Sequence, residues 1–298
     1  MNHFDAHYLT ALYFAIDELV KFYSNSYEHP LRETRGRPRQ LGTSGVLTIL
    51  IAAKRAGMKT TMHVHMLGEN MVMHGYFKSM PEYSHFTRLI RKLEPYLDFI
   101  VNYINKINVK EMTNFYIIDA AAIPITLYNR KKFIKWAHGH IGVGKNMNGW
   151  FQGLKLHLVV NEHQKIVACL ITMGNFHDSR ALFDDEFLEH IKGLLIGDKG
   201  YIIHEEDVYE LSKRGIDLIF KKRDNMDQRS NELNKELLAE RKRIERVFGT
   251  LRDGYQMVNA KARTIETFKI HIKAAILAHH VMKLQFFKPQ SKIALVTA

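Results

Sequence analysis

The stretch Phe115-Tyr116-Ile117-Ile118-Asp119 decides the fold of this chain, because four apolar residues lead directly into an acid. A short apolar run of this kind predicts a buried strand. Sites in α/β folds form where such strands end, since the surrounding backbone holds a side chain there in a fixed position. Asp119 is therefore a candidate site residue, although a turn or helix-cap role is the more common one for any single acid after a strand.

Further strands and helices follow this first strand. The apolar patterns predict strands over 153–160, 166–173, 194–196 and 216–220, and helices over 178–191, 204–213, 231–252 and 264–287. Three strands in a row, followed by strands that alternate with helices, indicate a mixed sheet flanked by helices. This α/β arrangement is the layout of a ribonuclease-H-like domain.

The residues before this domain have an all-helical pattern. Apolar residues recur at three- and four-residue spacing over 8–23, which predicts an amphipathic helix. Thr43 and Ser44 are placed to cap the next helix, and a later helix begins near Ser84. We therefore expect an all-α N-terminal domain over 1–112 and a ribonuclease-H-like domain over 113–298, which includes the C-terminal helix.

Two basic surfaces are expected in the helical domain. The first is an exposed loop that contains Gly, Pro and the arginines Arg35, Arg37 and Arg39. The second is the outer face of the helix near Ser84, formed by Arg88, Arg91 and Lys92. Short helices with a basic face are typical of helix-turn-helix-like DNA readers. A solvated helix face explains the second surface equally well.

The net charge of the chain is +12, which points to a polyanionic partner such as nucleic acid. A basic protein with no such partner is the alternative on composition alone. A single cysteine, Cys169, excludes an internal disulfide and a zinc site built on several thiolates. No apolar stretch approaches the roughly 18 residues of a membrane span, and we expect no signal peptide. These features predict a protein of a reducing cytoplasm.

Three acids stand out in the predicted ribonuclease-H-like domain, Asp119, Asp198 and Glu245. Asp198 follows the strand predicted over 194–196, and Glu245 lies on the helix predicted over 231–252. Carboxylates brought close together repel, so their pKa values rise unless a cation neutralises them. Mg²⁺ prefers such hard oxygen ligands. Two ions at one site can activate a water or a 3′-hydroxyl and stabilise the leaving oxygen of a phosphodiester.

The surroundings of two of these acids are basic. No acid occurs from 120 to 160, whereas six lysines and arginines do. Arg241 and Arg252 fall on the same side of the predicted helix as Glu245, because residues four and seven apart lie near one face. Such a basic surface suits a DNA backbone next to metal ligands. A plain helix salt bridge is the alternative for Glu245.

Five sequence blocks occur in a fixed order between about residues 112 and 280. They are Ile117-Ile118-Asp119-Ala120, Gly153-Leu154-Lys155-Leu156-His157-Leu158, Gly174-Asn175-Phe176-His177-Asp178-Ser179-Arg180-Ala181-Leu182, Gly197-Asp198-Lys199-Gly200-Tyr201 and Lys242-Arg243-Ile244-Glu245-Arg246-Val247-Phe248. With these blocks the chain resembles DDE transposases of bacterial insertion sequences, most closely the insertion-sequence 982 family. The segment Arg35-Gly36-Arg37-Pro38 also resembles the N-terminal region of that family. A lone Gly-Asp-Lys-Gly-Tyr would be a weak signal, whereas five ordered blocks are specific.

The resemblance implies a catalytic and metal-binding triad, formed by Asp119, Asp198 and Glu245. It also implies two Mg²⁺ ions, or Mn²⁺ in their place. Related transposases carry a Tyr-x₂-Arg-x₃-Glu-x₆-Lys signature, which Arg241 and Glu245 match and in which Arg252 stands for the lysine. Leu238 replaces the tyrosine, which puts a role of that tyrosine in doubt but not the metal site. The 47 positions from Asp198 to Glu245 leave no room for the large β-rich insertion domain of some relatives.

Several further residues are candidates with an ordinary alternative. His177 and Asp178 match a family block and are auxiliary residues near the metals, unless Asp178 only caps the next helix. Lys155 and His157 share one face of a strand and either contact the scissile strand or form a plain polar face. Lys199 is a candidate for a phosphate contact.

Other histidines and the two tryptophans give weaker signals. The pairs His63/His65 and His138/His140 lack the further ligands that a metal site needs. Trp136 and Trp150 are able to stack on bases, although core packing is the more common role. The sequence leaves both roles open for the tryptophans.

The residues and the resemblance together predict a DNA transposase. The helical domain would bind the terminal inverted repeats, and the ribonuclease-H-like domain would cut at the ends of the element and join the freed 3′-hydroxyl to target DNA. Pairing of two ends implies at least a homodimer, expected at the nucleoid of a prokaryotic cytoplasm, with no membrane partner. Two alternatives stay open, a metal nuclease without strand transfer and a catalytically silent, sequence-specific DNA-binding protein derived from a transposase.

Overall fold

The computed structural model describes residues 6–26, 40–127, 135–146, 149–223, 225–258 and 262–283. Its contacts divide the chain into two compact units. The helical unit combines residues 1–101 with 251–298, and the sheet unit consists of residues 102–250. Segments from both sides of the sheet unit in the sequence therefore contribute to the helical unit.

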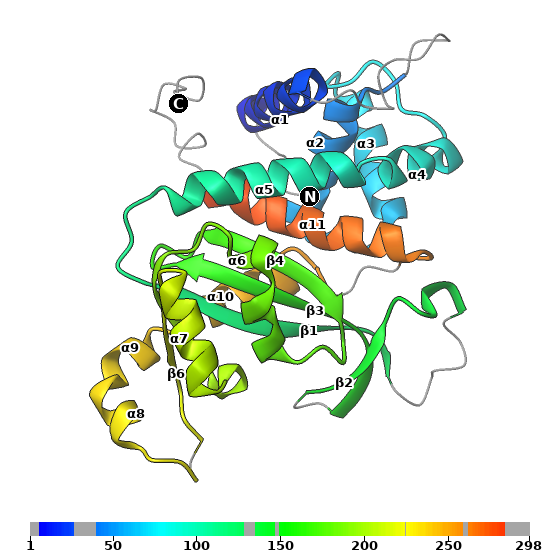
Figure 1. Cartoon of the computed structure of the whole chain (residues 1–298). Helices are drawn as coiled ribbons and strands as arrows, with labels where there is room; N and C mark the ends of the chain where they lie inside the picture. The colour runs from blue at the N-terminus through cyan, green and yellow to red at the C-terminus, as the bar shows by residue number, and fades with distance from the viewer. Residues whose placement is uncertain are drawn as a thin grey trace. The chain divides into compact units, whose positions relative to one another are not determined.

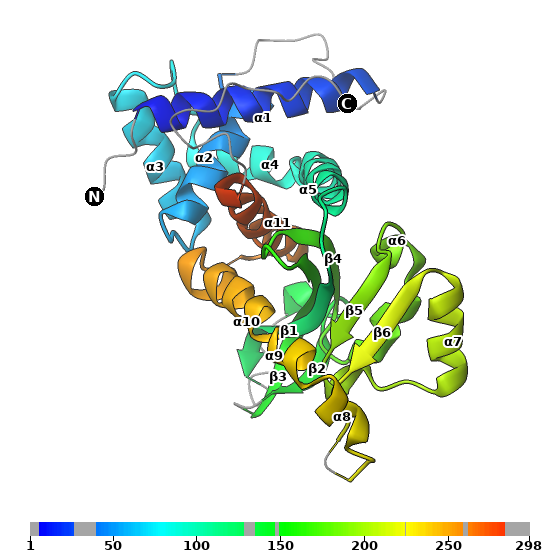
Figure 2. The same cartoon turned by 90° about the vertical axis from the view of Figure 1, so that its left-hand side faces the viewer.

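The helical unit is built around its second helix. Its helices are α1 (Ala6–Ser26), α2 (Thr43–Arg55), α3 (Thr61–Met73), α4 (Tyr83–Arg91), the first half of α5 (Glu94–Val109) and α11 (Ile265–Lys283). Every residue from Ser44 to Lys54 is buried, because α1, α3, α4 and α11 all pack against α2. Figure 2 shows α1 running across the other helices of this unit. No helix in the described part of the chain is long and apolar enough to cross a membrane.

Polar contacts join α11 to earlier helices of the helical unit. Lys273 Nζ lies 3.1 Å from Glu94 Oε1 and 2.6 Å from Asp98 Oδ1, both on α5. The Oγ1 of Thr61 and the Nε2 of His271 are 3.2 Å apart. The sequence predicted this helix as the end of the catalytic domain, whereas in the structure its buried face groups it with the N-terminal helices. The functional boundary near residue 112 stays a prediction.

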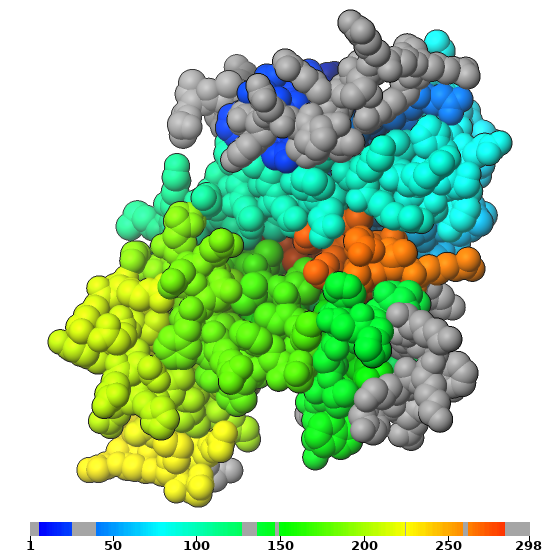
Figure 3. All heavy atoms as spheres, turned by 45° about the vertical axis from the view of Figure 1, so that its right-hand side comes forward, coloured from blue at the N-terminus to red at the C-terminus, as the bar shows by residue number. Residues whose placement is uncertain are grey.

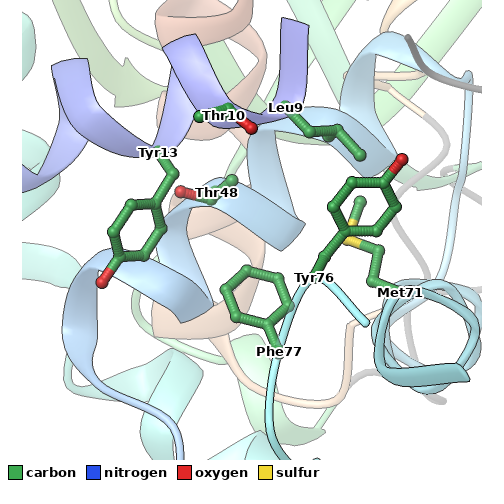
Figure 4. Close-up of a pocket in the computed structure, with 7 residues that line it drawn as sticks. All are labelled: Leu9, Thr10, Tyr13, Thr48, Met71, Tyr76 and Phe77. Atoms are coloured by element: carbon green, nitrogen blue, oxygen red, sulfur yellow. The ribbon is translucent and has the colours of Figure 1, made fainter. Parts of the chain in front are cut away.

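A pocket with a mostly apolar wall lies among α1, α2 and α3 (Figure 4). Its lining residues are Leu9, Thr10, Tyr13, Thr48, Met71, Tyr76 and Phe77. None of them carries a charge, so the pocket offers no charged side chain to a phosphate or a metal ion.

The sheet unit contains one mixed sheet (Figure 1). Its six strands are β1 (Tyr116–Leu127), β2 (Gly142–Asn146), β3 (Gly149–Asn161), β4 (Ile166–Met173), β5 (Gly193–Gly197) and β6 (Ile216–Phe220). Their order is β2-β3-β1-β5-β6, and β4 also pairs with β3. β3 is antiparallel to its three neighbours, whereas β5 runs parallel to β1 and β6. The predicted ribonuclease-H-like sheet after an all-helical N-terminal region is confirmed.

The strands β1 and β5 are paired only over a short length. Their bridges join Tyr116 to Leu195 and Ile117 to Ile196. Two positions beyond the last bridge, the chain reaches Asp119 on one side and Asp198 on the other. Asp198 thus follows the end of β5, where open α/β sheets form their sites. The prediction that Asp119 also follows a strand is wrong, because β1 pairs with β3 as far as Leu127 and carries Asp119 inside the strand, just beyond its bridges to β5.

Helices cover both sides of this sheet. α7 (Glu205–Lys213) packs on β6, and α10 (Lys242–Gly249) packs on β1 at the opposite side (Figures 1 and 2). The core on the α7 side includes the buried side chains of Ile118, Val159, Leu195 and Leu211. α10 buries Ile244 and Val247. The apolar stripe predicted on this helix is therefore the face that packs against the rest of the unit.

Most of the predicted strands and helices are confirmed, but two long helices are wrong. The segment 178–191 forms the short 3₁₀ helix η3 (Asp178–Phe183) and α6 (Asp185–Leu188). These are separate because Asp184 Oδ1 accepts a 2.8 Å hydrogen bond from the N–H of Phe187 and so begins a new helix. The segment 231–252 is covered by α8 (Arg229–Leu233), α9 (Lys235–Ala239), α10 and the π-helical turn η5 (Thr250–Gly254).

Asparagine side chains explain the first break in that second helix. Asn231 bonds the backbone N–H and carbonyl of Lys222, and Asn234 donates to the carbonyl of Ser230. Such bonds compete with the helical backbone. The predicted cap of α2 is also wrong, because Gly42 is the N-cap and the Ser44 hydroxyl donates to Asp17.

Candidate active site

Asp119 lies on β1, directly opposite Leu158 of β3. Its Oδ1 accepts a hydrogen bond of 2.8 Å from the N–H of Ala120. Burial raises the pKa of Asp119 to about 7, the Ala120 bond opposes this rise, and the negative charge of Asp198 adds to it. A carboxyl group in this environment gains strongly from a nearby cation.

Asp198 begins the short turn η4 (Lys199–Tyr201) at the end of β5. Its Oδ1 accepts a hydrogen bond of 2.6 Å from the N–H of Gly200. Its Oδ2 lies 3.7 Å from the Nη2 of Arg241. Arg241 is therefore the cation that partly neutralises Asp198 in this structure, and the same charge opposes the raised pKa of Asp119.

Asp178 is a third acid in this neighbourhood. Lys155 Nζ donates hydrogen bonds of 2.8 Å to Asp178 Oδ1 and to the carbonyl of Phe176. A Cβ added at Gly200 would lie 2.9 Å from Asp198 Oδ1 and 3.2 Å from Asp178 Oδ2. The two carboxylates thus flank the same glycine. The ion pair with Lys155 fixes the position of the Asp178 carboxylate.

Tyr201 is close to these acids and is not among the predicted site residues. Its side chain is fully buried, and its hydroxyl has no hydrogen-bond partner among the described residues. Burial and the neighbouring carboxylates raise the pKa of Tyr201 well above its usual range. A Cβ at Gly197 would lie 3.0 Å from the Tyr201 Cβ, so close packing requires this glycine. The Gly-Asp-Lys-Gly-Tyr block is the sequence signal that points to this tyrosine.

Glu245 lies on α10, one helical turn after Arg241. Residues four apart share a helix face, so Glu245 is on the side from which Arg241 reaches Asp198. The side chain of Glu245 is exposed and makes no hydrogen bond or ion pair with another described residue. The structure therefore brings Asp119 and Asp198 together and leaves Glu245 open to solvent.

The two auxiliary histidines have defined partners. His157 is fully buried, with its Nε2 2.9 Å from Thr172 Oγ1, and burial lowers its pKa to about 4. It is therefore neutral at pH 7 and does not lie on the open surface. His177 accepts a hydrogen bond from the N–H of Ser179 and is the N-cap of η3. The cap role considered for Asp178 thus belongs to His177.

The predicted DNA-binding residues differ in their placement. Arg35, Arg37 and Arg39 lie outside the described residues. Arg88, Arg91 and Lys92 are exposed at the end of α4, whose apolar face is buried as predicted. Lys199 is exposed next to Asp198. Arg252 is exposed, and its guanidinium lies 3.0 Å from the carboxylate of Asp253.

The residues present fit a divalent ion by the type of their donors. Asp119 and Asp198 offer hard carboxylate oxygens, and a cation between them would relieve their repulsion. Within the described ranges, no three His, Cys, Asp or Glu side chains are grouped so as to hold a metal ion. In the pair His63/His65, the Nε2 of His65 lies 2.8 Å from the carbonyl oxygen of Pro81, so this nitrogen has a backbone partner.

The sheet and its acids define the class of this protein, a ribonuclease-H-like α/β domain in a chain that also has an all-helical unit. The model of the transposase DDE domain family matches residues 109–265, which are 157 of the 298 residues. The chain therefore belongs to the transposase DDE domain family. Membership implies a transposase, with DNA as partner, in a family of phosphoryl-transfer enzymes that generally use divalent metals. No curated protein matches the sequence.

Proposed function

We propose that this protein is a transposase of the insertion-sequence 982 type that cuts DNA at the ends of its element and joins them to target DNA. The observation that carries the proposal is the convergence of Asp119 and Asp198 beyond the last β1–β5 bridge. Arg241 contacts Asp198 from the helix that carries Glu245 one turn later. The match to the transposase DDE domain family over residues 109–265 supports the same reaction.

Asp119, Asp198 and Glu245 would hold two Mg²⁺ ions, or Mn²⁺ in their place. When bound, the ions supply activation of the attacking hydroxyl and stabilisation of the leaving oxygen. Glu245 would complete the ligand set by turning its exposed side chain toward Asp198, which Arg241 already contacts. Lys199 is exposed next to Asp198 and would bind a phosphate of the scissile strand. Lys155 would keep Asp178 at a fixed position beside the metal ligands.

The helical part of the chain would recognise the terminal inverted repeats. The proposed functional domain spans residues 1–112, with a recognition surface on the exposed basic end of α4. Because two ends must be joined in one reaction, the active form would be at least a homodimer. The site of action would be the nucleoid of a prokaryotic cell.

A cleavage and strand-transfer assay on the DNA ends of the element tests this proposal. With Mg²⁺ or Mn²⁺, we expect nicked and joined products from the wild type. Asp119→Asn, Asp198→Asn and Glu245→Gln should each abolish both products and leave end binding intact. Asp217→Asn is a matched control, because Asp217 is an exposed acid on β6 of the same sheet and its loss should change neither product.

The same assay separates the alternatives. Nicked products without joined ones would favour a metal nuclease. Tight binding to the ends without cleavage in any divalent ion would favour a silent DNA-binding protein. That second candidate is kept because, among the described residues, no third acid completes a metal-binding group with Asp119 and Asp198. Wild-type rates from any of the three triad variants would refute the triad.

A further inference from the structure

The β2–β3 hairpin presents an exposed tryptophan. Trp150 is 56% exposed and is the largest of the exposed aromatic side chains among the described residues. It is paired across the hairpin with Lys145, whose Nζ lies 5.7 Å from the centre of the tryptophan ring. The hairpin extends beyond the rest of the sheet in Figure 1, and its green atoms form a projection in Figure 3. An exposed indole beside a lysine is therefore placed at an accessible edge of the sheet unit.

The reverse side of the hairpin is tightly packed. Phe151 is 2% exposed and lies opposite Gly144. A Cβ at Gly144 would come within 2.5 Å of the Gly174 carbonyl oxygen and 2.6 Å of the Phe151 ring. On the side of the hairpin opposite Trp150, Phe151 thus packs closely against the backbone of Gly144 and Gly174. The indole is presented by a fixed strand, which reduces the conformational entropy lost when a ligand stacks on it.

Trp150 is on the same face of the sheet as the first catalytic acid. Residues two apart on a strand share a face, so Trp150, Leu154 and Leu158 point to one side of β3. Leu158 is the partner of Asp119, and directly opposed residues point to the same side. The eight positions from Trp150 to Leu158 correspond to roughly 26 Å along the strand. Leu154 and Leu158 are themselves buried, so a DNA strand that reaches both the acids and the tryptophan would pass outside this covered part of the face.

The charge of the region favours a nucleic-acid strand over an apolar protein segment as the occupant. Residues 120–160 contain six lysines and arginines and no acid. Lys145 is exposed next to the indole, and Met173, opposite Leu154, adds an exposed apolar side chain to this face. An aromatic ring bordered by cations is the combination that binds unpaired bases and their phosphates.

We propose that Trp150 and Lys145 form a stacking site for an unpaired base of the DNA strand that the transposase processes. The indole would stack on the base, and Lys145 would bind the adjoining phosphate. The inference rests on the proposed function, because it takes the DNA bound at Asp119 and Asp198 as the ligand. It adds a contact roughly 26 Å along β3 from the acids that would bind the reacting phosphate.

Tryptophan fluorescence tests this site directly. The chain has two tryptophans, so Trp136→Phe makes Trp150 the sole emitter. This variant is titrated with an end duplex that carries a single-stranded overhang and with the fully paired duplex, while the anisotropy of labelled DNA reports binding. We expect the overhang duplex to quench the emission and to protect Trp150 from acrylamide more than the paired duplex does. The matched variant Trp150→Phe, which keeps Trp136, should show neither effect.

Affinity provides a second readout. Trp150→Ala should lose roughly tenfold in affinity for the overhang duplex and Trp150→Phe less, because stacking depends on the ring. Affinity for the paired duplex should not change in either variant.

Unchanged emission and accessibility in a protein that binds the duplexes would overturn the stacking site and leave the proposed function standing. Emission that changes with protein concentration in the absence of DNA would overturn it in favour of a contact between copies. Failure of the wild type to bind any duplex would refute both the stacking site and the proposed function.

Discussion

Lys54 is a buried lysine without a counter-ion in the described structure. It lies on α2 with its side chain fully buried, and its Nζ has no hydrogen-bond partner among the described residues. Burial lowers the pKa of Lys54 to about 7. His271 of α11 also faces this region, and burial, together with the Lys54 charge, lowers the pKa of that histidine. The helical unit therefore carries a destabilising group at its centre.

Replacement of Lys54 by methionine should stabilise the protein. Between about pH 7 and the ordinary lysine value of 10.5, the unfolded chain holds a proton on Lys54 that the folded chain lacks. The free energy of unfolding should thus rise with pH in this window, by up to roughly 1.4 kcal/mol per unit. At pH 7, Lys54→Met should add roughly 2–4 kcal/mol to the free energy of unfolding, and the gain should shrink toward pH 10. Urea unfolding of both proteins across this range measures the effect.

Lys59 provides the control for that measurement. Lys59 is exposed and lies between α2 and α3. Lys59→Met should therefore not alter the pH dependence of the free energy of unfolding. Equal slopes for the wild type and Lys54→Met would show that the Lys54 ammonium is satisfied in solution.

Single residues also show what the sequence could and could not predict of the site. Asp198 was predictable because it follows an apolar strand, and strand ends are rigid. Asp119 was selected on the same ground, but β1 continues to Leu127, because its pairing with β3 extends the strand beyond the apolar run. The Lys155–Asp178 pair and the burial of Tyr201 were not predictable, because they depend on side chains that only the folded sheet brings together. Whether Glu245 joins the two aspartates stays a prediction.

The β2–β3 hairpin depends on glycine at one position. The contacts that a Cβ would make at Gly144, with the backbone of Gly174 and the ring of Phe151, leave no room for a methyl group. Gly144→Ala should therefore destabilise the sheet unit by about 1–3 kcal/mol, as overpacking of a filled site generally does. Thermal unfolding followed by circular dichroism measures the loss.

Gly249 is the matched control in the same unit. A Cβ there meets no heavy atom within 4 Å, and the residue ends α10 in helical conformation. Gly249→Ala should be neutral or stabilise by about 0.5–1 kcal/mol through helix propensity. Similar losses for both alanine variants would contradict the packing account of the hairpin.

The bounds of a strand or helix can be predicted from the sequence where neighbouring residues determine them, and cannot where contacts with distant residues determine them. β4 and β6 match the predicted ranges because each is an apolar run with clear turn residues on both sides. The helix predicted over 231–252 fails because Asn231 and Asn234 find backbone partners that spacing alone does not reveal. β2 is not predicted, because its sequence Gly142-Val143-Gly144-Lys145-Asn146 has almost no apolar alternation. This segment forms a strand because it pairs with β3.

The charge of the whole molecule predicts a strong effect of salt on DNA binding. With a net charge of +12, binding should weaken linearly in log[salt], with a contribution to the slope of about −0.9 for each neutralised phosphate. Replacement of Arg88, Arg91 and Lys92 by glutamine should reduce the magnitude of the slope by roughly 2.7 if each contacts one phosphate. Anisotropy titrations with end DNA at several salt concentrations measure this.

An equal change of charge elsewhere serves as the control. Lys192, Lys213 and Lys235 are exposed residues of the sheet unit, and glutamine at all three should leave the slope nearly unchanged. The same loss of slope in both triple variants would show that total charge, not the α4 surface, governs binding. A slope near zero for the wild type would contradict the DNA-binding role of the chain.

The helical unit is assembled from two segments that are far apart in the sequence, and this fixes when it matures during translation. Helices α1 to α4 leave the ribosome first, but α11, which packs against α2 and α4, is made only after the 149 residues of the sheet unit. At 5–20 residues per second the nascent chain waits roughly 7–30 s for this last helix. The sheet unit can complete its folding earlier. A ribosome that stops before α11 therefore releases a chain with its acids in place and its helical unit unfinished.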